Sequence, residues 1–163
     1  MVKFAVSPDD KMQIAQLCDK IRQRLSNPYF FNWTSDSFLL EAQFSKVLFK
    51  TLPHLSDLAA LEHHHESSNS EIVSFVAYRE LDDSLEIMVL GTHPEHLRQG
   101  HQRQLINQLI NAAQMLGAKI WLEVHEQNQS AIDFYLKCGF KKISLRKNYY
   151  QDSAAALVMS YEK

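Results

Sequence analysis

The fold is decided by residues 85–116, which read LEIMVLGTHPEHLRQGHQRQLINQLINAAQML. An apolar run, Leu85–Leu90, is typical of a buried strand. Gly100 lies where the polar loop after this strand becomes a helix. Within that helix, apolar side chains recur at the spacing of a single face: Leu105, Ile106, Leu109, Ile110, Ala113 and Leu116. The stretch therefore predicts a strand–loop–helix unit with a glycine at the loop–helix junction.

The start of this helix has the chemistry of an anion site. The N–H groups of a first helical turn have no partner inside the helix, and the macrodipole gives them partial positive charge. A phosphate or pyrophosphate fits there, and Arg98 and Arg103 add charge on either side of Gly100. One glycine is a weak signal, so a tight turn with two solvated arginines is the alternative interpretation.

Composition restricts the class of protein. The chain has 163 residues, of which 45% are hydrophobic and 22% charged, and its formal net charge is −2. These values are ordinary for a globular protein, so we expect a single domain over residues 1–163. A large phosphate-backbone footprint is not expected without a long basic run, which argues against nucleic acid as a partner.

The sequence also bears on compartment and metals. No stretch approaches membrane-spanning length, and the N-terminal MVKFAVSPDD lacks a signal-peptide core. Cys18 and Cys138 lie far apart and fit no metal-ligand spacing. We therefore expect a reduced, cytoplasmic protein with no membrane partner and no metal.

The other elements follow from start signals and periodicity. Helices are expected from Ser7, from Thr34 through Leu48, and from Asn128 to Gly139. Strands are expected at Lys3–Val6, Leu55–Leu61, Ile72–Tyr78, Leu85–Thr92, Lys119–Val124, Phe140–Leu145 and Ala154–Tyr161. A strand meander followed by helical crossovers predicts a mixed sheet with helices on its faces.

Two segments carry open alternatives. The aromatic loop, residues 29–33 (Tyr-Phe-Phe-Asn-Trp), could cover the core between two helices or line a substrate site. The triplet His63–His65 resembles a metal site only at first sight, because adjacent side chains on an extended chain point to opposite faces. A solvated hairpin turn is the better interpretation of the triplet.

Three residues in the second half carry candidate chemistry. Glu123 lies within the apolar strand, where partial burial would raise its pKa and make it a base near neutral pH. An ordinary strand-end carboxylate is the alternative. Tyr135 is either a core tyrosine or a proton donor to a leaving thiolate. Asn128 precedes a helix, so it should cap that helix and could meet a ligand there.

Several motifs together resemble the GCN5-related N-acetyltransferase (GNAT) superfamily. They are Leu90-Gly91-Thr92-His93-Pro94 with Arg98-Gln99-Gly100, then Trp121-Leu122-Glu123-Val124, and then Asn128 with Ala131-Ile132, Phe134-Tyr135 and Cys138-Gly139-Phe140. The tail Arg146-Lys147-Asn148-Tyr149-Tyr150 resembles the branch that acetylates protein N-termini, including the ribosomal-protein-alanine acetyltransferases. The resemblance extends from Leu85 to Met159.

The resemblance implies an α/β fold whose mixed sheet is splayed in the middle and flanked by about four helices. Acetyl-CoA would lie in the splay, between the strand ending near Thr92 and the strand Lys119–Val124. The implied cofactor-binding residues are the strand end, the phosphate loop and the helix cap: Leu90, Gly91, Thr92, Arg98, Gln99, Gly100, His101, Gln102, Arg103 and Asn128.

The implied activity is transfer of an acetyl group from acetyl-CoA to a primary amine of a small molecule or a protein N-terminus. Glu123 would deprotonate the amine through water, and Tyr135 would protonate the leaving thiolate. A backbone N–H near Leu90–Thr92 would stabilise the oxyanion. Direct attack is favoured over a cysteine intermediate, because both cysteines fit structural roles. A monomer or a homodimer is expected.

The chain departs from the family pattern in three places. Leu97 and Gln102 stand at the ends of the phosphate loop, and Gln102 brings a long side chain where the backbone normally approaches phosphate. Residues 154–156 are alanines where the N-terminal-acetylating branch often has an acidic residue, and the loop after Tyr149-Tyr150 is short. Tyr149 and Tyr150 could line the binding site of an acceptor peptide or pack at a strand end.

Two hypotheses compete with acetyl transfer. They are a non-catalytic acyl-CoA-binding module and an unrelated α/β nucleotide-phosphate binder.

Overall fold

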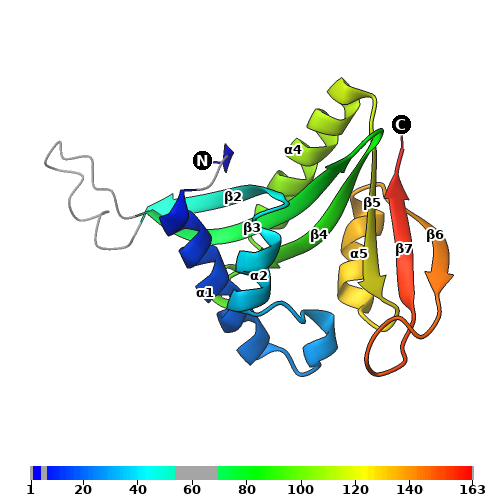
Figure 1. Ribbon diagram of the computed structural model, residues 1–163, viewed down its shortest axis with the longest axis horizontal. Coiled ribbons are helices and arrows are strands. Elements are labelled where there is room, and N and C mark those ends of the chain that lie inside the picture. The colour runs from blue at the N-terminus through cyan, green and yellow to red at the C-terminus, as the bar shows by residue number, and fades with distance from the viewer. Residues whose placement is uncertain (1, 5–6, 54–69, 163) are drawn as a thin grey trace, which may run out of the picture.

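The computed structural model describes residues 2–4, 7–53 and 70–162 (Figure 1). These residues form a seven-stranded mixed sheet with the order β1-β2-β3-β4-β5-β7-β6. Neighbouring strands are antiparallel except β4 and β5, which run parallel. The strands are β1 Val2–Phe4, β2 Lys46–Pro53, β3 Ser70–Leu81, β4 Ser84–Thr92, β5 Lys119–His125, β6 Lys141–Arg146 and β7 Ala156–Tyr161.

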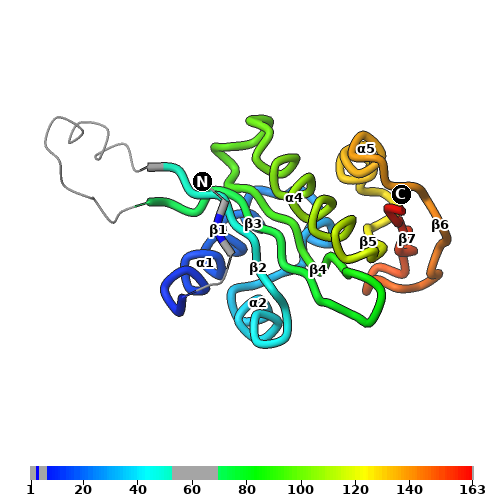
Figure 2. Tube along the Cα trace, turned by 90° about the horizontal axis from the view of Figure 1, so that it is seen from above, coloured from blue at the N-terminus to red at the C-terminus, as the bar shows by residue number. Residues whose placement is uncertain are grey.

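Helices cover both faces of the sheet (Figure 2). On one face lie α1 (Pro8–Arg24) and α2 (Ser35–Glu41), and on the other lie α4 (His101–Leu116) and α5 (Gln129–Lys137). Two short 3₁₀ helices, η1 (Pro28–Phe30) and η2 (Pro94–His96), lie in connecting loops. The predicted α/β class and the predicted order of elements are confirmed.

The helix starts follow the predicted local chemistry. Ser7 caps α1 in a reciprocal pair with Asp10, in which each side chain accepts the backbone N–H of the other residue. Thr34 caps α2, and the Asn128 Oδ1 atom accepts the Ala131 N–H at the start of α5. Gly117 ends α4 in the left-handed conformation.

The second helix is shorter than predicted. It ends at Glu41 rather than continuing to Leu48, because Val47 and Leu48 belong to β2. Val47 and Phe49 pack in the core cluster beneath α1 and α2, whereas Leu48 packs in the cluster beneath α4. A strand buried on both faces has apolar residues at successive positions. The alternation of apolar and polar residues that marks a strand is therefore absent from its sequence.

Because β2 pairs with β3, it occupies the place in the sheet that the sequence assigned to Leu55–Leu61. The Leu55–Leu61 strand and the His63–His65 turn lie outside the described residues.

A β-bulge interrupts the middle of β4. Tyr78 of β3 pairs with Ile87 and Ala77 pairs with Val89, which leaves Met88 without a partner across the ladder. The bulge also reverses the faces of the strand. Ile87 packs in the α4 cluster, and Val89 packs in the α1 cluster two residues later.

The bulge coincides with the end of the pairing between β4 and β5. Ile87 and Leu122 form the last aligned pair, and beyond them the strands separate (Figure 1). A bulge bends its strand and increases its twist, so Met88 gives a local cause for the separation. The predicted splay is confirmed.

Beyond the bulge, β4 lies tightly against the helical layer at Gly91. A Cβ added to Gly91 would lie 2.6 Å from the Cε1 atom of Phe75 and 2.8 Å from the Cδ1 atom of Ile21. Glycine is needed here because the Phe75 and Ile21 side chains occupy the space that a Cβ would take. The path of β4 beside the gap depends on this close contact between the Gly91 backbone and the two side chains.

We predict that Gly91→Ala lowers the free energy of unfolding by about 1–3 kcal/mol, the usual cost of overpacking a core. Urea denaturation of the variant measures this loss. Phe75→Leu serves as the control background, because it removes the ring that the new methyl meets. The cost of Gly91→Ala should shrink in that background, and additive costs would contradict the steric explanation.

Candidate active site

A cavity of about 760 Å³ occupies the space where β4 and β5 separate. Its walls include Glu86–Thr92 of β4 and Leu122–His125 of β5, and the start of α5 closes one side. The aromatic loop, residues 29–33, and the pair Tyr149-Tyr150 line it as well. The aromatic loop therefore lines the cavity and also covers the core, since Phe31 is buried beneath α1 and α2, while its role as a substrate wall stays a prediction.

The cavity connects the two faces of the sheet. Leu122 and Val124 of β5 pack in the cluster beneath α4 and α5. Side chains alternate along a strand, so Glu123 and His125 face the side of α1 and α2. One end therefore lies beside α5 and the predicted phosphate loop, and the other lies beside the aromatic loop. We call them the cofactor end and the acceptor end.

The edge of β4 beside the gap offers backbone groups. The Gly91 carbonyl accepts from the Ser74 hydroxyl, and the His93 N–H donates to the Val73 carbonyl, both toward β3. Backbone groups alternate in direction along a strand, so those of Leu90 and Thr92 face the gap. This is the arrangement required for hydrogen bonds to an extended arm or a thioester oxygen.

The predicted phosphate loop has an unusual backbone. Arg98 has φ 62° and Gly100 has φ 81°, both in the left-handed region. Left-handed residues in such turns let successive N–H groups converge, which makes a concave anion site. A Cβ at Gly100 would meet no atom within 4 Å, so glycine serves the backbone conformation rather than close packing.

Only some side chains of this loop line the cavity. Arg98, Gln99, Gly100 and Arg103 are exposed and do not line it. The His101 ring is buried away from the cavity, 3.2 Å from the Gln99 amide oxygen. Any contact of these residues with a phosphate therefore involves backbone groups or mobile, exposed charges.

Gln102 differs from the rest of the loop. Its side chain is half-buried and lines the cavity together with that of Leu97. The Gln102 side chain therefore does not turn away from the cavity, and its effect on CoA affinity stays a prediction.

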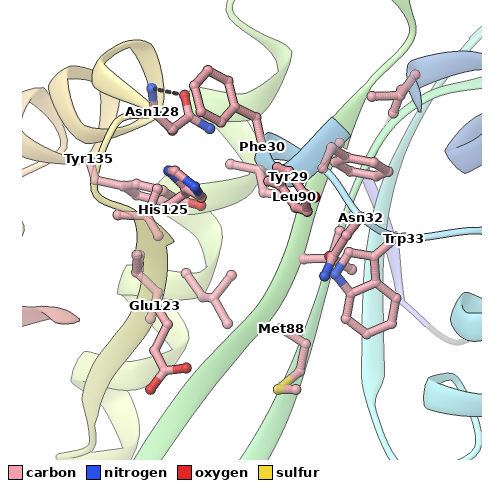
Figure 3. A pocket seen from close by; sticks show the side chains of 18 of the residues that line it. Tyr29, Phe30, Asn32, Trp33, Met88, Leu90, Glu123, His125, Asn128 and Tyr135 are labelled. Atoms are coloured by element: carbon pink, nitrogen blue, oxygen red, sulfur yellow. Dashed lines mark hydrogen bonds between the residues drawn. The ribbon is translucent and has the colours of Figure 1, made fainter. Parts of the chain in front are cut away.

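Asn128 and Tyr135 both reach the cavity from α5 (Figure 3). The Asn128 Oδ1 atom is occupied by the cap and by the Ser130 hydroxyl, so its amide nitrogen is the group left for a ligand. Tyr135 is 7% exposed, and burial raises its pKa well above the ordinary value. Its phenol therefore stays protonated.

Glu123 points away from Asn128 and Tyr135 (Figure 3). Its carboxylate accepts from the Arg146 guanidinium, and Arg146 in turn lies over the Tyr149 ring at 4.7 Å. The hydrogen bond to Glu123 is the largest cause that raises the pKa of Tyr149. Glu123 thus interacts with Arg146 at the end of β6 and with Tyr149 in the loop that follows.

A second carboxylate beside Glu123 was missed by the sequence analysis. Glu86 of β4 lines the cavity, and burial raises its pKa, partly offset by Arg79. Arg79 is itself held by a bidentate pair with Glu41, at 2.7 and 2.6 Å. The alternation of Glu86 with Leu85 and Ile87 was visible in the sequence, but its proximity to Glu123 depends on the strand register.

His125 was also missed. It is 2% exposed, and its Nε2 atom lies 3.0 Å from the Asp152 carboxylate in the loop between β6 and β7. In the sequence it is a single histidine at a strand end, with no signal that separates it from the others.

The structure therefore brings seven of the predicted site residues together around one cavity: Leu90, Gly91, Thr92, Gln102, Glu123, Asn128 and Tyr135. Within the described ranges, no group of three or more His, Cys, Asp or Glu side chains is arranged to hold a metal ion. No helix in the same ranges has both the length and the apolar character to cross a membrane.

Comparison with known proteins shows the family to which the chain is similar. Residues 18–140 match the sequence profile of the acetyltransferase (GNAT) family. N-alpha-acetyltransferase 50 of Danio rerio is 29% identical over 115 residues, which are 69% of this chain and 68% of that protein. The [ribosomal protein bS18]-alanine N-acetyltransferase of Haemophilus ducreyi is 34% identical over 85 residues, covering 52% of this chain and 59% of that relative.

A solved structure supports the fold. The ribosomal-protein-S18-alanine N-acetyltransferase of Escherichia coli superimposes with a TM-score of 0.72 at 20% sequence identity, covering 98% of this chain and 92% of that chain.

The chain belongs to the GNAT family of acetyltransferases. Membership confirms the predicted fold, the class of enzyme and acetyl-CoA as the acetyl donor that the family uses.

We predict that Gln102→Ala tightens CoA binding. Ordering a long side chain costs about 0.5–1.5 kcal/mol, so its removal should lower the Kd by about twofold to tenfold. Isothermal titration with CoA measures the Kd, and Gln104→Ala, an exposed glutamine two residues along α4, is the control. Weaker binding by Gln102→Ala would show that the Gln102 side chain assists the cofactor.

Proposed function

We propose that the protein transfers the acetyl group of acetyl-CoA to the primary amine at the N-terminus of a protein or peptide. The observation that carries the proposal is a single cavity with two different ends. One end adjoins the left-handed phosphate loop and Asn128, and the other is lined by Glu86, Glu123 and the aromatic loop. Such a cavity can hold the donor and the acceptor with their reacting atoms together.

The donor half of the mechanism uses backbone groups. The pyrophosphate would meet the N–H groups around Gly100, and the pantetheine arm would lie along the free edge of β4 at Leu90 and Thr92. An N–H at that edge would stabilise the oxyanion as the amine attacks the thioester carbon. The C–S bond then breaks, and Tyr135 supplies the proton that converts the leaving thiolate to CoA thiol.

The acceptor half requires a base, because an ammonium has no lone pair with which to attack. We propose that Glu123 takes this proton through a water molecule. Its carboxylate is paired with Arg146, while the raised pKa of neighbouring Glu86 makes that residue the competing candidate. Glu86 aligns with Trp121 across β4 and β5, and Glu123 lies two residues after Trp121 on β5. Both carboxylates therefore face the same side of the sheet.

An extended peptide suits the acceptor end better than a small polar amine. Aromatic and apolar side chains dominate its walls, and two of the wall residues, Leu40 and Phe44, are largely exposed at 62% and 70%. The relatives named as N-terminal acetyltransferases also support this class of acceptor. A non-catalytic acyl-CoA-binding module is the second candidate, because Gln102 occupies space beside the phosphate loop.

We also propose that residues 1–163 act as one domain in the cytoplasm. The two helical layers share one sheet, and both cysteines are free thiols, as a reducing compartment requires.

The proposed activity predicts thiol release from acetyl-CoA that depends on an unblocked amine. A panel of short peptides varying only in the first residue would be incubated with the protein and acetyl-CoA, with free thiol measured over time. Peptides with blocked N-termini and an internal lysine serve as controls, and small polyamines test the other acceptor class. CoA binding without turnover on the whole panel would favour the non-catalytic module.

The two carboxylates predict different pH–rate profiles. An N-terminal amine has a pKa of about 8, so it needs a base near pH 7 but is already neutral well above that value. Glu123→Gln should lower kcat/KM by about a hundredfold near pH 7 and far less at high pH. Glu86→Gln is the matched variant and should lose less.

A larger pH-dependent loss in Glu86→Gln would transfer the base role to Glu86. The raised pKa of Glu86 would then place the acidic limb of the profile at a higher pH than an ordinary glutamate gives. An equal loss at every pH in Glu123→Gln would remove Glu123 as the base.

A further inference from the structure

His125 has both ring nitrogens occupied at the end of β5. Its Nδ1 atom accepts the Gln127 N–H at 3.2 Å, so that nitrogen carries no proton. The hydrogen therefore lies on Nε2, which donates to the Asp152 Oδ2 atom at 3.0 Å. The ring has no free nitrogen to receive a proton from an amine, although it lines the acceptor end of the cavity.

Asp152 connects this ring to the loop between β6 and β7. Its second oxygen, Oδ1, accepts the Ala154 N–H at 3.1 Å, which fixes the turn before β7. The same turn contains Tyr150, whose N–H donates to the Ala154 carbonyl. The hydrogen bond from His125 lowers the pKa of Asp152, so the carboxylate stays charged and a strong acceptor.

Two aromatic rings enclose His125. The Tyr150 ring lies 4.7 Å from it, and the Phe30 ring meets it edge-on at 5.3 Å. Phe30 belongs to the aromatic loop, whereas Tyr150 follows β6, so His125 joins two segments about 120 positions apart in the sequence. Figure 3 shows Phe30 and His125 side by side within the cavity wall.

Both segments also line the acceptor end. We propose that His125 is a positioning residue that clamps the β6–β7 loop and the aromatic loop to the end of β5, and so sets the shape of the acceptor site. This inference rests on the proposed acetyl transfer for its kinetic consequences. The clamp holds the loop that carries Tyr149 beside Glu123, so it also orients the group that hydrogen-bonds the base.

Steady-state kinetics with the best peptide of the panel test the proposal. His125→Ala and Asp152→Ala should raise the KM for the peptide by about tenfold to a hundredfold, because displaced walls no longer position it. The Kd for CoA should stay within about twofold in Asp152→Ala, since the hydrogen bonds of Asp152 go to His125 and Ala154 rather than to the phosphate loop.

Asp152→Asn provides the conservative rescue, because its amide oxygen can still accept from His125. Its peptide KM should stay within about threefold of the unmodified protein, given that only the charge of the acceptor is lost. Glu162→Gln, which breaks an exposed ion pair with Lys119, is the matched control for loss of a carboxylate.

Hydrogen exchange gives a readout that needs no acceptor. Amides of Tyr150 and Ala154 should exchange faster in His125→Ala and in Asp152→Ala, while those of α4 keep their protection. If His125→Ala fails to fold, Asp152→Ala carries the test, because Asp152 lies on a surface turn.

The outcomes separate the two proposals. An active protein whose variants show unchanged peptide KM and unchanged exchange overturns the clamp. Equal increases in peptide KM and in CoA Kd also overturn it, because they indicate general destabilisation. Absence of thiol release from every acceptor overturns the proposed function, and faster exchange confined to the β6–β7 loop would still support the clamp.

Discussion

The interruption of hydrogen bonding between β4 and β5 is the constraint on which the rest of the site depends. The parallel pairing ends at Ile87 and Leu122, where Met88 bulges from β4. Beyond that point each strand has an edge without a strand partner, so buried backbone groups must find other partners. A ligand with an extended, amide-containing arm supplies such partners, which explains why a defect in the sheet can become a binding site.

The same separation places charge and aromatic surface at one end of the cavity. Glu41 pairs with Arg79 and Glu123 pairs with Arg146, so two carboxylates next to the acceptor site are held by guanidinium groups. Glu86 belongs to neither ion pair, and burial raises its pKa. Buried charges are costly unless they are paired, so burial favours the protonated form of Glu86 more than that of an exposed glutamate. His125, at the end of β5, has hydrogen bonds to Asp152 and Gln127.

Local signals predicted much of this structure. Ser7, Thr34 and Asn128 are caps because short polar side chains satisfy the first N–H groups of a helix, a rule that needs no tertiary information. The strand β4 was predicted from a continuous apolar run and the amphipathic helix α4 from helical spacing, which are also local signals. The placement of Glu123, Asn128 and Tyr135 came from the family resemblance rather than from spacing, and their catalytic and binding roles stay predictions.

Features that depend on non-local contacts escaped the sequence. Val47 and Leu48 continued a helical pattern, but pairing with β3 and burial on opposite faces of the sheet make them part of a strand. Glu86 and His125 acquire their significance only through partners far along the chain, Glu123 in one case and Asp152 in the other. The Met88 bulge likewise exists only in the register between β3 and β4, which no single-strand pattern encodes.

The measurement that tests the central claim most directly is a crystal structure of the protein with CoA bound. The account predicts the pantetheine arm between Met88–Thr92 and Glu123–His125, with hydrogen bonds to the backbone of Leu90 or Thr92 and the pyrophosphate at Gly100. Continuous pairing of β4 with β5 past Ile87, or CoA bound outside the gap, would contradict it.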